Sequence, residues 1–200
     1  EVPTLLRKKG TQQNTNFYLL DGYFKVESND PIHWTLTQET KTQGNYDLQK
    51  ATCEFGGRHW EAWFTKDFAI TEGPYKFNGL PGMVFQVSDS KKQFVFTLVK
   101  SYQLEKTYDS SLFIDKFGGQ NPISISQKRL DKLLLDQYKN PLNDFKESFK
   151  NRKEGDVFKV MNVDVESLDQ FKQLTEMTQK RIRDNNNPIE LDKKINYPDK

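Results

Sequence analysis

Cysteine and histidine are scarce in this chain of 200 residues, and their scarcity restricts its chemistry. Cys53 is the single cysteine, so no disulfide can form within the chain. The two histidines, His33 and His59, show no spacing typical of a catalytic triad or a zinc site, and we expect neither a metal nor a cofactor. A dyad of Cys53 with His59 across the turn at Gly56-Gly57 is an alternative, although a cysteine within a strand is usually inert.

Strong net charge is also missing, as are long apolar runs and nucleotide-binding loops. The chain has 30 basic and 28 acidic residues, a net charge of +2, which argues against nucleic acid as the main partner. No apolar run approaches the length that crosses a bilayer, so we expect no transmembrane segment. The glycine spacing matches neither the P-loop nor the dinucleotide-binding pattern.

Aromatic residues, in contrast, make up 13% of the chain, which is consistent with a β-rich core. Alternating apolar residues predict six or seven strands in meander order before residue 103. Helical periodicity predicts three later helices, at about 126–139, directly after Asn140-Pro141, and at about 167–183.

The expected fold class is therefore α+β. We expect a curved antiparallel sheet of about six to eight strands, with an open half-barrel as one form of it, and C-terminal helices packed on it. We expect a single domain over residues 1–200, with a β-rich part at 1–102 and a helical part at 103–200.

One predicted strand, at residues 46–55, changes its apolar face part-way. Tyr46 and Leu48 share one phase, whereas Ala51 and Cys53 share the other. This change predicts a β-bulge or an edge bend near Lys50.

Two basic residues in or beside these strands have two interpretations. Lys50 and Arg58 either form an anion site or pair with Glu54 or Glu61 across strands. We favour the pairing.

The most informative stretch is GPYKFNGLPGMVFQV, which begins at Gly73. Pro74 and Pro81 restrict φ and cannot donate a hydrogen bond, whereas Gly79 and Gly82 tolerate positive φ. Pro81-Gly82 predicts a type II turn. The segment is therefore expected to be a rigid, sharply folded loop, which serves as a structural corner or, alternatively, approaches a ligand closely.

We call residues 73–82 the Gly/Pro loop. Trp63 lies on the opposite face of its strand from Trp60, so it is exposed if helices cover only one face of the sheet. The residues expected to contact a ligand or partner are aromatic or apolar side chains in and before this loop, together with one histidine: Trp63, Tyr75, Phe77, Leu80 and His59.

The stretch GPYKFNGLPGMVF, preceded by KATCEFGGRHWEAWFTKDFAI and followed later by NNNPIEL, resembles the GLPGLI family of exported Bacteroidota proteins. The resemblance covers residues 33–102 and, as a second short match, 185–191. Met83-Val84 stand where the family has Leu-Ile, a volume-conserving change. The family's usual cysteine two residues after Tyr46 is Leu48 here, so no cysteine role carries over.

This resemblance implies a location rather than a reaction. It implies a cleaved signal peptide, so we expect Glu1 to open a mature chain in the periplasm or beyond. Genes of the family often stand beside those of TonB-dependent outer-membrane receptors, which implies an outer-membrane protein as a partner. The strand order is also similar to the open half-barrels of periplasmic lipoprotein carriers.

Three functions are consistent with these observations. The first is a non-enzymatic envelope protein that binds a protein partner or apolar ligand through the curved sheet and the Gly/Pro loop. The second is an accessory subunit of an outer-membrane assembly of the TonB-dependent receptor type. The third is a hydrolase that uses His59, Glu61 and Asp67, which requires those side chains to converge in one cleft.

Overall fold

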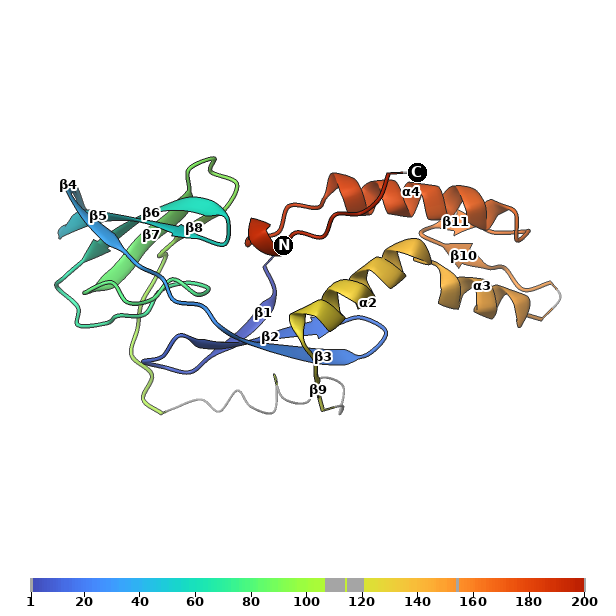
Figure 1. Ribbon diagram of the computed structural model, residues 1–200, viewed down its shortest axis with the longest axis horizontal. Coiled ribbons are helices and arrows are strands. Elements are labelled where there is room, and N and C mark those ends of the chain that lie inside the picture. The colour runs from blue at the N-terminus through green and yellow to red at the C-terminus, as the bar shows by residue number, and fades with distance from the viewer. Residues whose placement is uncertain (1, 107–113, 115–120, 154, 200) are drawn as a thin grey trace. The chain divides into compact units, whose positions relative to one another are not determined.

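The computed structural model describes residues 2–106, 114, 121–153 and 155–199 (Figure 1). The chain divides into two units, which comprise Glu1–Ser126 with Pro188–Lys193, and Gln127–Asn187 with Lys194–Lys200. The sequence predicts one domain that becomes helical at residue 103. In the structure the division falls after Ser126, and a short segment beyond the last long helix belongs to the first unit. We call Pro188–Lys193 the returning segment.

The first unit contains a four-stranded sheet in the order β1-β2-β3-β9. Its strands are β1 (Thr4–Arg7), β2 (Gln13–Leu19), β3 (Tyr23–Asn29) and β9 (Ile123–Ser124). Strands β2 and β3 form a hairpin around Asp21-Gly22, in which Leu19 pairs with Tyr23, so the connection has three residues.

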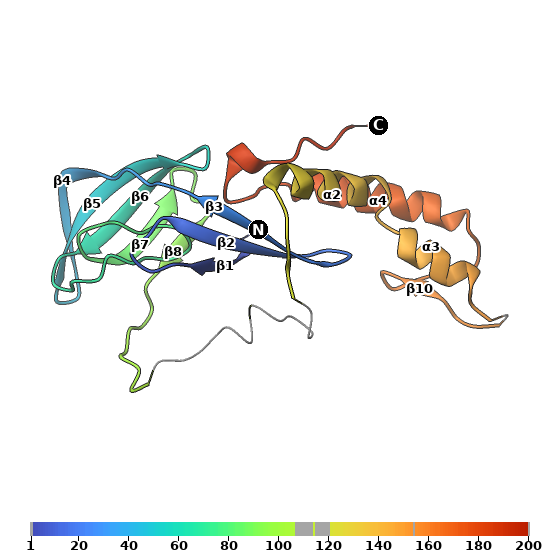
Figure 2. The same cartoon turned by 60° about the horizontal axis from the view of Figure 1, so that its bottom comes forward.

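The first unit also contains a five-stranded antiparallel sheet in the order β4-β5-β6-β7-β8 (Figures 1 and 2). Its strands are β4 (Thr35–Gln43), β5 (Tyr46–Phe55), β6 (Arg58–Thr65), β7 (Met83–Asp89) and β8 (Val95–Thr97). The α+β class and the meander order are thus confirmed, with curved, open sheets. The predicted single sheet is instead divided into two.

Apolar clusters form on both faces of the five-stranded sheet. The first face carries the larger core, to which β6 contributes Trp60, Ala62 and Phe64. The second face carries a smaller cluster of Leu48, Met83 and Phe85.

These two clusters explain the change of apolar phase along β5. Leu48 packs in the second cluster, whereas Ala51 and Cys53 pack in the first. The β5–β6 register is regular through this point. The pairing of β4 with β5 is irregular opposite Lys50, because Leu36 pairs with Ala51 whereas Thr40 pairs with Gln49. The irregularity predicted near Lys50 is therefore present, with the extra residues on β4.

The second unit is mainly helical. Its helices are α2 (Gln127–Lys139), α3 (Asn143–Lys150) and α4 (Gln170–Asp184), and its strands β10 (Lys159–Val160) and β11 (Val163–Asp164) form a small ladder. The side chain of Gln170 accepts the N–H of Ser167 at 3.0 Å, but the N-cap of α4 is Asp169 and its side chain makes no cap hydrogen bond, so a complete capping box is not formed. Among the described residues, no helix combines the length and apolarity that a membrane span requires.

Helices α3 and α4 bury apolar side chains in a cluster that includes Val160 of this ladder. Phe149, Phe171 and Leu174 pack together with Val160 and Val165 in a cluster of their own. The remaining helical turn, η1 (Leu191–Lys193), ends the returning segment and belongs to the first unit.

Candidate functional site

The Gly/Pro loop is fastened to the first face of the five-stranded sheet by Phe77. This side chain is fully buried, and its ring centroid lies 4.4 Å from that of Trp60. Trp34 tilts against the same ring and donates its indole N–H to the carbonyl of Asn78 at 2.8 Å. Leu80 is also buried. The loop is therefore held by core packing as well as by its own prolines.

Two glycines of the loop are required by close backbone approach. A Cβ at Gly73 would lie 2.1 Å from the carbonyl oxygen of Phe77, and one at Gly82 would lie 1.9 Å from that of Thr65. The predicted type II turn does not form. Gly82 instead donates its N–H to the carbonyl of Leu80, two residues back, which makes a tighter three-residue turn.

A buried cluster of charges lies beneath the loop. The ammonium group of Lys76, whose side chain is 1% exposed, lies 2.9 Å from Asp30 and 2.7 Å from Glu190. Lys193 pairs with both of the same carboxylates, and Tyr75 donates its hydroxyl to Glu190. Two positive and two negative side chains thus balance each other, as burial of charge requires.

The protonation of this cluster follows from those contacts. Burial alone raises the pKa of Glu190, but the charge of Lys76 and hydrogen bonds from Lys193, Lys76 and Tyr75 outweigh it, so the pKa is lowered. The pKa of Asp30 is lowered in the same way, with Ser28 and Lys76 opposing the effect of burial. Both carboxylates are therefore ionised at neutral pH.

The pKa of the Tyr75 hydroxyl shifts in the opposite direction. Burial, followed by the negative charge of Glu190, raises the pKa of its hydroxyl far above the ordinary range. Its backbone has a φ of 52°, which is unusual for a bulky residue. The hydrogen bond to Glu190 and edge-on packing against Phe77 keep it in this conformation.

The returning segment supplies Glu190 and is itself held by the turn between β5 and β6. The N–H of Leu191 donates to the carbonyl of Gly56 at 2.6 Å, and a Cβ at Gly56 would lie 2.9 Å from the side chain of Glu190. Arg58 donates to the carbonyls of Pro188 and Ile189 at 2.7 and 2.9 Å. The two stretches with the family resemblance, which residues 103–184 separate in the sequence, therefore meet in one place.

Arg58 is thus not part of an anion site. Its buried guanidinium pairs with Asp89 at 3.3 Å and donates to Gln93 at 2.8 Å. Lys50 forms the predicted cross-strand pair with Glu61 at 3.6 Å and a second pair with Glu39 at 3.2 Å. Its pKa is raised, first of all by the hydrogen bond to Glu39.

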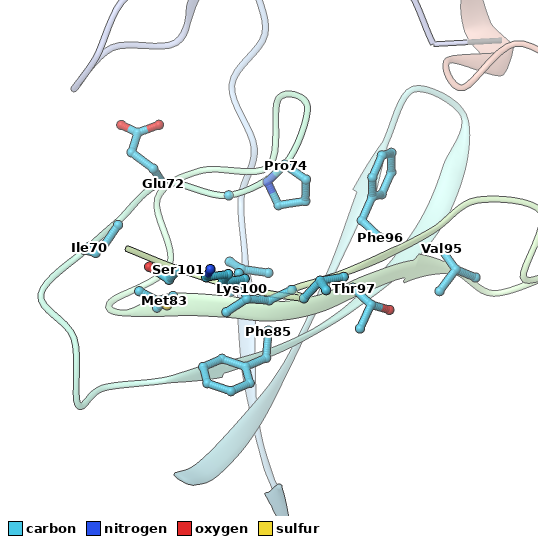
Figure 3. Close-up of a pocket in the computed structure, with 14 residues that line it drawn as sticks. Ile70, Glu72, Pro74, Met83, Phe85, Val95, Phe96, Thr97, Lys100 and Ser101 are labelled. Carbon is cyan, nitrogen blue, oxygen red and sulfur yellow. The ribbon is translucent and has the colours of Figure 1, made fainter. Parts of the chain in front are cut away.

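An open groove of about 740 Å³ lies between the Gly/Pro loop and the edge of the five-stranded sheet (Figure 3). Ile70 and Pro74 form one wall, the start of β7 from Met83 to Phe85 lines the middle, and the chain from Val95 to Ser101 forms the other side. This volume falls in the range of small-molecule and peptide sites, about 300–1,000 Å³.

The groove has apolar walls and a charged rim. Glu72 and Lys100 are the charged residues among the described residues that line it. Glu72 pairs with Arg7 of β1 at 2.7 Å, and Arg7 also donates to the carbonyl of Gly73 at 3.0 Å. The wall formed by the Gly/Pro loop is therefore fixed from the neighbouring sheet.

The contact residues expected from the sequence are not brought together in this groove. Phe77 and Leu80 are 0% and 1% exposed and belong to the core, so their expected contact role is not compatible with this structure. Tyr75 is bound to Glu190. Trp63 is half-buried on the second face, where the ammonium group of Lys41 lies 4.3 Å from its ring.

The residues named for a hydrolase are also apart. His59 contacts the carboxylate of Glu54 at 2.6 Å, and Glu61 pairs with Lys50. Asp67 follows the far end of β6, and at about 3.3 Å per residue the strand separates it from His59 by about 25 Å. These side chains do not converge.

The Cys53–His59 dyad is not formed either. Cys53 pairs with Trp60 in the register and points into the first-face core, whereas His59 pairs with Glu54 on the opposite face. Burial and the nearby Glu54 raise the pKa of Cys53 to about 12. The thiol is therefore protonated at neutral pH and a weak nucleophile.

The buried charge cluster and the groove were not anticipated from the sequence. The available signal was a lone charge between apolar neighbours: Lys76 between Tyr75 and Phe77, and Glu190 between Ile189 and Leu191. Such positions within otherwise buried stretches indicate buried ion pairs.

Comparison with known proteins gives a short family match. A family model described as "Protein of unknown function (Porph_ging)", an uncharacterised family found in Bacteroidota, matches residues 57–86. This match includes β6, the Gly/Pro loop and the start of β7. A search of the curated proteins finds no match.

Solved structures give a distant likeness. The structure of PNGF-II in space group C2 aligns with 66% of this chain and 25% of its own, at 16% identity and a TM-score of 0.46. The structure of PNGF-II in space group P21 aligns with 60% of this chain and 22% of its own, at 16% identity and a TM-score of 0.42. This chain therefore spans about a quarter of the length of that protein.

Proposed function

We propose that this chain is a non-enzymatic binding protein of the bacterial envelope, of the GLPGLI type, which holds a protein partner or an apolar ligand in the groove beside the Gly/Pro loop. The observation that carries this proposal is the groove itself, with its volume of about 740 Å³ and apolar walls. The residues that line the groove differ from the contact residues expected from the sequence, but the Gly/Pro loop contributes to both.

Rigidity of the wall that the Gly/Pro loop forms supports a binding role. The Gly/Pro loop is anchored by Phe77 from below and by Arg7 from the side. A preformed apolar site loses little conformational entropy when it is occupied. The family match over residues 57–86 includes the same loop. The resemblance to exported Bacteroidota proteins makes an outer-membrane protein a candidate partner.

The test uses substitutions of exposed groove residues. Ile70 and Val99 line the groove and are 43% and 94% exposed, so Ile70→Gln with Val99→Gln makes it polar with little effect on stability. Leu36→Gln is the matched control, because Leu36 is 44% exposed on β4 at the opposite edge of the sheet.

Two measurements apply to these variants. The first is binding of N-phenyl-1-naphthylamine, an uncharged apolar probe whose fluorescence rises on burial. The second is capture of tagged full-length protein from the native envelope, with mass spectrometry of proteins and lipids. We expect the double substitution to remove probe binding or the stoichiometric partner, and Leu36→Gln to retain both. If the groove variant retains the probe and every captured molecule, the proposal is wrong.

A further inference from the structure

The edge of the five-stranded sheet beside the groove has backbone groups that face outward. In the described part of the chain β8 pairs with β7 alone. The N–H of Leu98 donates to the carbonyl of Phe85 at 2.8 Å, which continues the β7–β8 ladder. Because successive amides of a strand point to opposite sides, those of Thr97 and Val99 point away from β7. They are placed to pair with a further strand.

Apolar side chains accompany these backbone groups. Val95 is 49% exposed and Val99 is 94% exposed, and Tyr102 and Leu104 farther along are 71% and 57% exposed. The groove follows the same stretch of chain, from Val95 to Ser101. A strand added at this edge would place alternate side chains over the groove, as in recognition by strand addition.

The charge of the edge is positive. Residues 90–106 contain four lysines, at positions 91, 92, 100 and 106, and one glutamate, Glu105, a net charge of +3. The four lysines are all exposed. The preceding acid, Asp89, is buried against Arg58 and does not offset this charge at the surface. A basic edge repels a second copy of itself and attracts an acidic strand.

The opposite edge of the sheet, formed by β4, is more polar and less regular than the β8 edge. Strand β4 has the sequence TLTQETKTQ, in which Leu36 is the apolar residue, and its pairing with β5 is irregular between Leu36 and Thr40. Polar composition and an irregular register are features that protect an edge from further pairing. The contrast favours β8 as the interaction edge.

From these observations we infer that β8 and the residues that follow it, Val95 to Lys100, bind an extended segment of a protein partner in which apolar and acidic residues alternate. The segment pairs with the outward amides of Thr97 and Val99, places apolar side chains over the groove, and presents carboxylates to Lys91, Lys92 and Lys100. This inference rests on the proposed binding function and specifies the partner.

The direct test uses synthetic peptides of about nine residues, long enough to pair with one strand. One peptide alternates glutamate and valine, and its control alternates lysine and valine. Titration of full-length protein, followed by amide chemical shifts and hydrogen exchange, is expected to show saturable binding of the acidic peptide with protection of the Thr97 and Val99 amides. Binding should weaken at high salt, because exposed charges are screened. Equal binding of both peptides, or no protection at these amides, overturns the inference.

A proline substitution separates strand addition from filling of the groove. Thr97→Pro removes an outward N–H without removing a ladder bond, since proline is tolerated on the solvent side of an edge strand. We expect a loss of about tenfold or more in acidic-peptide affinity, because a hydrogen bond is lost and its acceptor is left unpaired. Thr42→Pro, at an outward position on β4, is the matched control and should have no effect.

The groove-binding function and the strand-addition inference can be refuted independently of each other. If Thr97→Pro leaves peptide binding and partner capture intact while the groove substitutions remove them, the binding function stands and strand addition is refuted. If wild-type protein forms dimers that Thr97→Pro abolishes, the edge belongs to a second copy and the acidic-partner assignment is refuted. Capture of lipid alone, unaffected by Thr97→Pro, also refutes it.

Discussion

Removal of one charge from the buried cluster should destabilise the first unit strongly. Glu190→Met deletes the carboxylate that faces Lys76, Lys193 and Tyr75 and leaves the cluster with a net charge of +1. Lys76→Met deletes the ammonium group and leaves −1. The side chain of Lys76 is 1% exposed and that of Glu190 is 8% exposed, so water cannot compensate either loss.

The magnitude follows from burial. Breaking a buried pair by removing one partner costs about 3–5 kcal/mol, whereas replacing both partners by apolar residues is often neutral. The double variant Lys76→Met with Glu190→Met retains Asp30 with Lys193, 3.4 Å apart, and is again neutral in charge. We expect its free energy of unfolding to exceed the additive expectation by about 2 kcal/mol or more.

Urea unfolding followed by tryptophan fluorescence measures this effect, since all three tryptophans lie in the first unit. The exposed pair of Lys25 with Glu27, at 3.3 Å, is the matched control, and Glu27→Met should cost less than about 1 kcal/mol. Single-variant losses below about 1 kcal/mol, or strictly additive losses, would refute the view that burial makes this cluster interdependent.

Three further predictions concern stability and reactivity. The pKa values of Asp30 and Glu190 are lowered in the folded state, so their contribution to the free energy of unfolding is present above the ordinary carboxyl pKa values and is lost as the pH falls through the lower folded values. The urea midpoint should therefore decline below about pH 5, and less steeply in Glu190→Met than in the wild type. An equal decline in both proteins would contradict this. Gly82→Ala should abolish folding as judged by circular dichroism, because its Cβ would lie 1.9 Å from a backbone oxygen. Gly79→Ala has open space around its Cβ and should lower the free energy of unfolding by about 1–2 kcal/mol, because its φ is +87°. Similar losses in both variants would show that the loop relaxes. Cys53 should resist Ellman's reagent at pH 8 until urea unfolds the chain, and rapid labelling of the native protein would contradict its burial.

Local pattern predicted much of the fold. Alternation identified β5, β6 and β7, and helical periodicity placed α2 within one residue of its observed start. The two-phase pattern of β5 was also visible, but its cause was not a bulge in that strand. Both faces of the sheet carry apolar clusters, and alternation along a single strand cannot distinguish these two causes.

The candidate site was less predictable because it depends on distant contacts. Lys76 and Glu190 are 114 residues apart, and no periodicity links them. The turn at Pro81-Gly82 follows the approach of Gly82 to the backbone of Thr65 rather than the dipeptide preference. The groove combines segments on either side of β7, so the sequence identified one wall, the Gly/Pro loop, without the other.

The returning segment has a consequence for the order in which the protein forms. Ile189 belongs to the first-face core and Glu190 pairs with Lys76, yet both are synthesised after helices α2, α3 and α4. A ribosome that has completed the two sheets has therefore made a unit with a gap in its core, in which Asp30 is the remaining carboxylate of the cluster beside Lys76. The first unit reaches its full stability only when residues 188–193 have been made and are in place. A nascent chain is therefore expected to unfold easily until this segment has been made.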